Sequence, residues 1–274
     1  MNPNRLVRTV SLALAALCLP AALPARAAEG HGGGAGTVYP KDDYPYAELV
    51  KRPLTLSAGI IQLDVPVESN LSKDEVGKPW SIPLSLDFGL SDDLTIGVFH
   101  QTGLCFAGTS NGCERVYDDL GARATLGILR DPGGQLALRA AVLAQSLKDS
   151  LYAGSIGAAY KRTLGNLALV LGVDYVASLT KRDERSVKDE LAGDAELQLQ
   201  IAEGLAAFGR IGYTKFLGEA AGVDLGYWVP VGFGVEFEPV SRLDVGVDFT
   251  FDNLLGKDGT ADERSGRVFV RLFL

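Results

Sequence analysis

The sequence predicts an all-β protein, a single antiparallel up-and-down transmembrane β-barrel of about 12 strands. Two observations predict this fold. Apolar and polar residues alternate at period two in many segments, and the connections between these segments alternate between short and long. In the last segment one row is aliphatic and the other carries two arginines. The two rows are Val268, Val270, Leu272 and Leu274, and Arg267, Phe269, Arg271 and Phe273. In a barrel the aliphatic row meets lipid and the arginines face a wet lumen.

The other segments repeat this alternation, and each is roughly 9 to 16 residues long, as a tilted membrane-spanning strand requires. In residues 82–90 the even-numbered positions are apolar, and Asp87 lies in the opposite row. In residues 243–252 the odd-numbered positions are apolar, and Asp244 and Asp248 lie opposite them. The sequence therefore predicts an outward apolar face and an inward polar face for each strand.

The connections alternate in length along the chain. Short turns are expected at residues 91–93, 130–134, 164–166, 203–204 and 238–242, several of which contain Gly or Pro. Longer or more polar connections are expected at residues 68–79, 104–116, 181–190 and 253–265, with tight ones around Asp149 and Gly218. Short turns on one side and long loops on the other are typical of an outer-membrane barrel. With both termini on the turn side, the number of strands is even.

The N-terminal region has the pattern of a secretory signal peptide. Arg5 and Arg8 form a basic head, an apolar stretch covers residues 10–23, and small residues surround Arg26. The apolar stretch is too short for a transmembrane helix, which needs roughly 20 residues. We expect cleavage after residue 28 and export of the mature chain.

Three regions follow from these patterns: a signal peptide at residues 1–28, an N-terminal leader at residues 29–52 and a barrel at residues 53–274. The leader combines a glycine run with Tyr39, Tyr44 and Tyr46, each next to a proline. One interpretation is a disordered periplasmic leader. The alternative is a plug that folds into the lumen, because a linker does not require these tyrosines.

The whole pattern resembles Gram-negative outer-membrane β-barrels over about residues 54–274. The resemblance implies a location in the outer membrane, contact with its lipid, and recognition of the final strand by the barrel assembly machinery. In those proteins the final strand usually ends in an aromatic residue. Here Leu274 is last and Phe273 precedes it, so the chain departs from the assembly signal by one position.

Composition and cysteine spacing narrow the possible partners. Three of the 26 basic residues lie in the signal, so the mature chain carries 23 basic against 34 acidic residues, a net charge of −11, which argues against nucleic-acid binding. Cys105 and Cys113 share one connection, and export to an oxidising compartment predicts a disulfide between them. The alternative is two free thiols. No ligand spacing predicts a metal site, and nothing predicts a cofactor.

The inward rows predict a lumen lined by both signs of charge, with acids in excess. The predicted lining residues are Asp87, Asp119, Arg123, Arg139, Asp174, Asp194, Glu196, Arg210, Asp224, Glu236, Asp244, Asp248, Arg267 and Arg271. In one interpretation these charges pair across strands and fill the barrel. In the other they line a narrow channel with a mild cation preference. Inward glycines such as Gly121, Gly157 and Gly246 favour open space.

The predicted function is passage or binding of a small polar solute, and the alternative is a non-conducting structural or surface-interaction barrel. We predict no enzymatic activity. A remote alternative is a lipid hydrolase that uses His100 on the lipid-facing wall, with Thr102 two residues away. No third group is present to orient such a base, so we interpret His100 as an interfacial residue. The sequence identifies neither the solute nor the oligomeric state.

Overall fold

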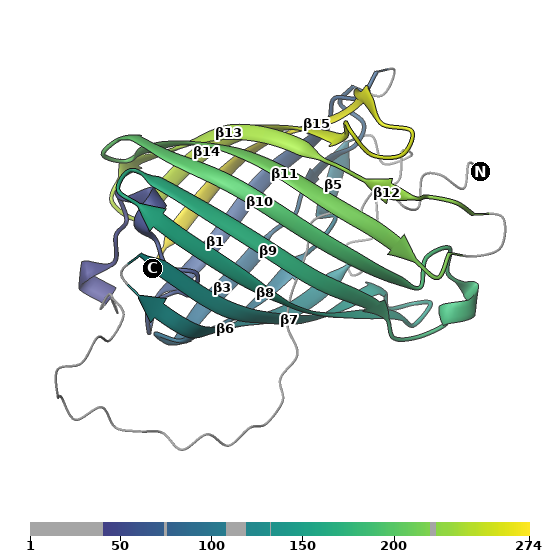
Figure 1. The fold of residues 1–274 in the computed structure, drawn as a ribbon, viewed down its shortest axis with the longest axis horizontal. Helices are drawn as coiled ribbons and strands as arrows, with labels where there is room; N and C mark the ends of the chain where they lie inside the picture. The colour runs from purple at the N-terminus through teal and green to yellow at the C-terminus, as the bar shows by residue number, and fades with distance from the viewer. Residues whose placement is uncertain (1–40, 74–75, 108–118, 132, 220–222) are drawn as a thin grey trace, which may run out of the picture.

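The computed structural model describes residues 41–73, 76–107, 119–131, 133–219 and 223–274. Within these residues, 12 long strands form a closed antiparallel barrel (Figure 1). They are β1 (Ile61–Asn70), β3 (Ser85–Ser91), β4 (Leu94–His100), β6 (Leu120–Asp131), β7 (Gly134–Ser146), β8 (Leu151–Leu164), β9 (Leu167–Ser178), β10 (Asp189–Ala202), β11 (Leu205–Leu217), β13 (Val231–Val240), β14 (Leu243–Asn253) and β15 (Thr260–Phe273). Three short strands, β2 (Trp80–Ile82), β5 (Leu104–Ala107) and β12 (Tyr227–Trp228), extend the sheet in the loops. Three short 3-10 helices are η2 (Lys41–Asp43), η3 (Leu49–Lys51) and η5 (Arg182–Glu184).

The first and last long strands close the barrel. Each long strand pairs with the next one along the chain, and β1 pairs with β15 from Gln62 opposite Phe273 to Asn70 opposite Ser265. This seam leaves the 12-strand sheet without a free edge over its length. The predicted antiparallel barrel and its strand number are confirmed.

Burial alternates along the strands as the sequence predicts. Val268 on β15 is 58% exposed, whereas the adjacent Phe269 is 5% exposed. On β3, Leu86 is exposed and Asp87 is buried. The outer surface is therefore aliphatic, and the charged side chains are inside. Outward tyrosines lie toward the strand ends, as expected for an interfacial girdle, and Tyr213 stacks on Tyr227 with 5.7 Å between ring centroids.

The two ends of the barrel differ as the connection lengths predict. The short turns lie at one end together with the C-terminus, at the left in Figure 1, and β5, β12 and η5 lie toward the other. We call these the turn end and the loop end. The tight turn expected around Gly218 is wrong, because the chain runs from β11 through residues 218–230 before β13 begins. Gly218 and Gly226 both have positive φ and bend the chain twice there.

The segment before β1 enters the barrel at the turn end (Figure 1). Its backbone N–H groups donate to side chains of three separate strands: Val50 to Gln200 at 3.2 Å, Leu54 to Gln135 at 2.8 Å, and Leu56 to Thr95 at 2.7 Å. We call residues 41–57 the mouth segment. Because β1 begins at residue 61, the segment preceding the barrel extends past the predicted boundary at residue 52. The predicted signal at 1–28 and leader residues 29–40 lie outside the described residues.

An apolar cluster holds the mouth segment against the wall. Tyr44, Tyr46, Leu56 and Ile60 pack around Phe273, near the C-terminus. The ring centroid of Phe273 lies 5.7 Å from that of Tyr44 and 5.4 Å from that of Tyr46. Aromatic contacts at these distances add to the hydrophobic stabilisation. The inward row of the last strand therefore binds the start of the described chain.

Inward glycines do not leave open space, contrary to the sequence-based prediction. A Cβ at Gly121 would lie 2.3 Å from the Phe99 ring, and one at Gly246 would lie 2.2 Å from the Phe269 ring. A side chain from a neighbouring strand thus lies over each glycine and against the wall. The absence of a Cβ lets large inward side chains fit beside one another in a narrow barrel.

Gly157 provides a test of this packing. A Cβ there would lie 1.7 Å from Asp174 Oδ1 and 2.3 Å from the carbonyl oxygen of Val173. We expect Gly157→Ala to lower the free energy of unfolding by about 1 to 3 kcal/mol, because the backbone must shift. Urea titration of the refolded barrel measures this. Gly209→Ala is the matched control, since nothing lies within 4 Å of its Cβ position; equal losses in both variants would contradict the explanation.

Candidate functional site

Arg271 on β15 joins three strands inside the barrel. Its Nε donates to Asp64 on β1 at 2.8 Å, and its Nη1 donates to Glu236 on β13 at 2.7 Å and to Asp244 on β14 at 3.4 Å. Period-two alternation puts all four side chains on the inner face. Asp244 is fully buried, so its charge depends on these hydrogen bonds.

Asp248 on β14, nearer the loop end, likewise joins arginines from different strands. It is 4% exposed and accepts hydrogen bonds from Arg267 Nε at 2.6 Å and Arg210 Nη2 at 2.9 Å. Across the barrel, Arg123 Nε donates to Asp87 at 2.8 Å. Fixed arginine–carboxylate pairs thus line the middle of the lumen.

The mouth segment adds a further arginine to these contacts. Arg52 Nη2 donates to Asp244 at 2.8 Å, and its Nη1 donates to Glu236 at 3.1 Å. Its guanidinium also lies 4.9 Å from the centroid of the Phe273 ring. Arg52 is buried, and its backbone carbonyl accepts a hydrogen bond from Lys161 Nζ at 2.8 Å. The segment is therefore fixed to the wall by charge as well as by apolar contacts.

These contacts fall into three groups of ion pairs, which together we call the arginine network. It contains five arginines and five carboxylates: Arg52, Arg123, Arg210, Arg267 and Arg271, with Asp64, Asp87, Glu236, Asp244 and Asp248. The total formal charge of these residues is balanced, although Arg52 and Arg271 share three carboxylates and Arg210 and Arg267 share only Asp248. A separate pair, Arg139 with Asp174, lies on β7 and β9, and Asp194 approaches Arg139 to 3.8 Å.

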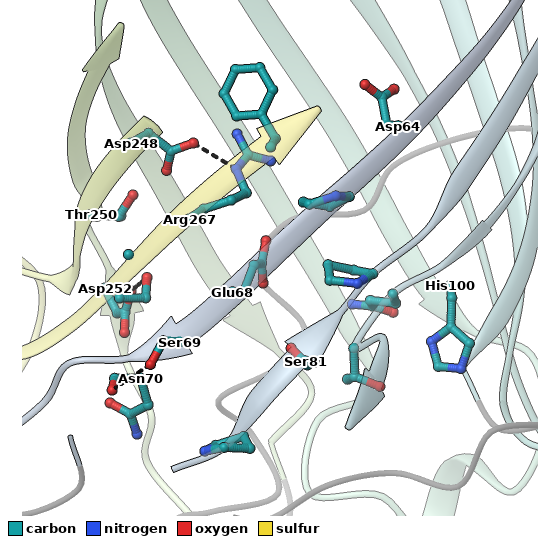
Figure 2. A pocket seen from close by; sticks show the side chains of 18 of the residues that line it. Asp64, Glu68, Ser69, Asn70, Ser81, His100, Asp248, Thr250, Asp252 and Arg267 are labelled. Carbon is teal, nitrogen blue, oxygen red and sulfur yellow. Dashed lines mark hydrogen bonds and ion pairs between the residues drawn. The ribbon is translucent and has the colours of Figure 1, made fainter. Parts of the chain in front are cut away.

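Two chambers lie along the lumen. The loop-side chamber, shown in Figure 2, has a volume of about 450 Å³, and the turn-side chamber one of about 490 Å³. Both are lined by Phe269 and by four arginines of the network: Arg123, Arg210, Arg267 and Arg271. Mouth-segment residues, among them Arg52 and Leu56, line the turn-side chamber alone. The arginine network thus forms the boundary that the two chambers share.

Comparisons with known proteins agree with this architecture. No protein-family model and no curated protein matches the sequence. The structure of the NanC porin matches with a TM-score of 0.56 and 10% identity, over 77% of this chain and 100% of that one. An outer membrane channel from Pseudomonas putida F1 matches with a TM-score of 0.57 and 15% identity, over 80% of this chain and 97% of that one. The KdgM porin gives a TM-score of 0.54 and 8% identity, over 77% and 98%.

The chain has the fold of an outer-membrane β-barrel. At these identities the similarity concerns the fold. In an outer-membrane β-barrel the outward aliphatic row faces lipid, short turns lie on the periplasmic side and longer loops face outward. In this chain the mouth segment lies at the turn end, and the loop-side chamber lies toward the loop end.

Most predicted lining residues do line the lumen of this barrel. Those that line one or both chambers are Asp87, Arg123, Arg139, Asp194, Glu196, Arg210, Glu236, Asp248, Arg267 and Arg271. Asp174 and Asp244 point inward but lie behind arginines, at 2% and 0% exposure. Asp119 precedes β6 with a φ of 58° and is buried.

Asp224 instead lies outside the strands, in the connection between β11 and β12. Its side chain is largely exposed and lies 2.6 Å from Lys257 Nζ. The hydrogen bond from Lys257 holds the pKa of the Asp224 carboxyl below its ordinary value. The alternation that suggested an inward position does not apply, because Asp224 belongs to no strand.

The structure also shows lumen residues that the sequence-based analysis left out. Arg52 was assigned to the leader, and Glu68 to a loop, although β1 extends to Asn70. Glu68 shares the parity of Gln62 and Asp64, so extending the alternation would have found it. The signal for Arg52 is weaker: apolar residues and tyrosines precede it in a segment too short for a core of its own.

His100 is not on the lipid-facing wall, which corrects its interpretation as an interfacial residue. It is 7% exposed and lines the loop-side chamber, and its Nδ1 accepts a hydrogen bond from the Gly103 N–H at 2.8 Å. Thr102 lines the same chamber. His100 is the last residue of β4, where the next residues fold over it, so strand parity no longer sets its direction. The remote lipid-hydrolase alternative loses the lipid access that it required.

Metal and cysteine chemistry add little to the site. Within the described residues, no three His, Cys, Asp or Glu side chains are grouped to hold a metal ion. Cys105 lies on β5, and Cys113 lies outside the described residues, so the disulfide stays a prediction. Among the residues that the structure describes, no helix is long and apolar enough to cross a membrane.

Proposed function

We propose that this protein is a narrow outer-membrane channel for small polar solutes. The observation that carries the proposal is the pair of polar chambers that meet at the arginine network. They provide a polar route from the loop end to the mouth segment, inside a wall whose outer face suits lipid. The printed descriptions of the similar structures, two porins and an outer membrane channel, support the same class.

The charged side chains along this route favour the passage of small solutes over a wide, water-filled pore. Arginines and carboxylates of the network are fixed to each other, and both chambers have volumes typical of small-molecule sites. The KdgM porin was solved with oligogalacturonate, an acidic chain. We do not assign an acidic substrate here, because the network is balanced in formal charge.

The proposal includes the biogenesis that the sequence predicts. The chain is exported through the signal at residues 1–28, and the barrel assembly machinery inserts it into the outer membrane of a Gram-negative cell. Cys105 and Cys113 form a disulfide in the oxidising compartment. No residue is assigned a catalytic role.

Single-channel conductance of the refolded mature chain in a planar bilayer tests the proposal. We expect small, stable steps and a reversal potential in a KCl gradient that shows a mild cation preference, because the lining outside the network is acidic. Correct folding is checked by the shift in gel mobility on heating.

The second candidate function, a non-conducting structural or surface-interaction barrel, is favoured by one observation: the mouth segment occupies the turn end of the lumen. A folded barrel without steps in any salt would support it and contradict the channel.

A further inference from the structure

We propose that the loop-side chamber is a binding site for a small polyhydroxylated solute that carries an ammonium group, with Glu68 as its counter-ion. This inference deepens the proposed channel function. It rests on that function in one respect: the site binds a solute that then passes through the channel. The binding step itself requires only the chamber.

Glu68 carries a charge that the surrounding residues leave without an ion pair. Arg267 is its direct neighbour in the β1–β15 register, but the Arg267 guanidinium is bonded to Asp248 with Nε at 2.6 Å. Figure 2 shows Glu68 in the middle of the chamber, between Arg267 and Ser81. Within the described residues the Glu68 carboxylate has no hydrogen bond or ion pair. It lines the chamber and is only partly exposed.

The charges that line the chamber make this carboxylate important. Among the described residues, the lining has five carboxylates, Asp64, Glu68, Asp248, Asp252 and Glu263, and four arginines, Arg123, Arg210, Arg267 and Arg271. Asp252 also lines the chamber, and it accepts a hydrogen bond from the Ser265 hydroxyl at 2.8 Å. The described lining of the chamber therefore has more carboxylates than arginines. A partly desolvated carboxylate attracts a cation more strongly than one in bulk water does.

Thr102 provides a second, independent observation. It lines the same chamber and is 8% exposed, and its buried Oγ1 lacks a hydrogen-bond partner within the described residues. A buried hydroxyl without a partner is costly, and a ligand that supplies one recovers that cost. Thr102 thus points to a ligand with hydroxyl groups, whereas Glu68 points to one with a positive charge.

The chamber has the size and composition for such a ligand. Its volume of about 450 Å³ lies in the range of small-molecule sites. Ser81 lies directly opposite Glu68 in the β1–β2 register, and its hydroxyl adds a further hydrogen-bonding group. A bare metal ion is not favoured, because within the described residues no three His, Cys, Asp or Glu side chains are grouped to hold one. A polyol with one ammonium group would use the carboxylate and the hydroxyls together.

Titration calorimetry on the refolded full chain tests the proposal with two matched probes. Glucamine has an ammonium group in place of one hydroxyl of sorbitol. We expect glucamine to bind about tenfold or more tightly than sorbitol, because a hydrogen bond to a charged group contributes about 1.5 to 3 kcal/mol. Glu68→Gln should abolish this preference while leaving sorbitol binding unchanged. Thr102→Val should weaken both probes alike.

Glu184→Gln is the control variant. It removes one negative charge from η5 at the same end of the barrel, where the Glu184 side chain is 70% exposed. Glucamine binding should be unchanged in this variant. Equal binding of glucamine and sorbitol, or equal losses in Glu68→Gln and Glu184→Gln, would overturn the proposal.

Conductance of the same preparations separates this inference from the channel function. Glucamine preference without conductance would leave the site in place and refute passage. Conductance without glucamine preference would leave the channel in place and refute the site.

Discussion

Deleting residues 41–57 should raise the single-channel conductance several-fold. The mouth segment lines the turn-side chamber, and its residues Tyr44, Val50 and Leu56 are buried against the wall. Its removal widens the route at the turn end. The measurement is conductance in a planar bilayer, at equal salt and voltage, for the full and shortened mature chains.

Two substitutions make this prediction sharper. Gly89→Ala keeps the chain length but places a Cβ 2.1 Å from the Ser57 carbonyl oxygen, so it should displace the segment and also raise conductance. Glu48→Gln, in an exposed part of the same segment, should not change it. An unchanged conductance in both the deletion and Gly89→Ala, with intact folding, would show that the segment does not limit passage.

Asp244→Ala should lower the free energy of unfolding by about 3 kcal/mol, or prevent refolding altogether. Asp244 is fully buried and accepts hydrogen bonds from Arg52 and Arg271. Its removal leaves two partly buried guanidinium groups with fewer partners, and breaking a buried pair from one side is strongly destabilising. Urea-dependent unfolding of the refolded barrel, followed by tryptophan fluorescence, measures the change.

The control for this prediction is an acid that lies outside the barrel. Asp224→Ala removes an exposed ion pair with Lys257 and should leave the unfolding midpoint unchanged. The double variant Arg52→Ala/Asp244→Ala should lose less stability than the sum of the two single changes, because the two residues share one contact. If the losses of stability were additive, Asp244 would stabilise the barrel through residues other than Arg52.

The sequence predicts the wall of this barrel well because the wall obeys a local rule. Side chains on a strand alternate with period two, so Val268 outside and Phe269 inside follow from adjacent letters. The rule also predicts that Arg271 and Asp248 point inward. It says nothing about which charges meet, since partners such as Arg271 and Asp64 are distant in sequence and depend on how the barrel closes.

The rule fails where strands end. His100 is at the end of β4, and the chain folds back over it, so parity no longer sets its direction. Asp224 lies between β11 and β12, outside the strands, although the tight connection expected around Gly218 would have put it in one. The prediction for the inward glycines fails for a different reason. The sequence suggests open space at Gly121, but the ring of Phe99 from a neighbouring strand occupies that space.

The cluster at the mouth also depends on closure of the barrel. Tyr44 and Tyr46 come from the start of the described chain, and Phe273 is the second-last residue. Phe273 reaches the mouth when β15 has paired with β1, which is the most sequence-distant pairing in the sheet and costs the most loop entropy. The contacts of Tyr44 and Tyr46 with Phe273 therefore depend on closure of this seam. The mouth segment packs against Phe273 at the β1–β15 seam, so the residues that narrow the passage also help to hold these two strands together.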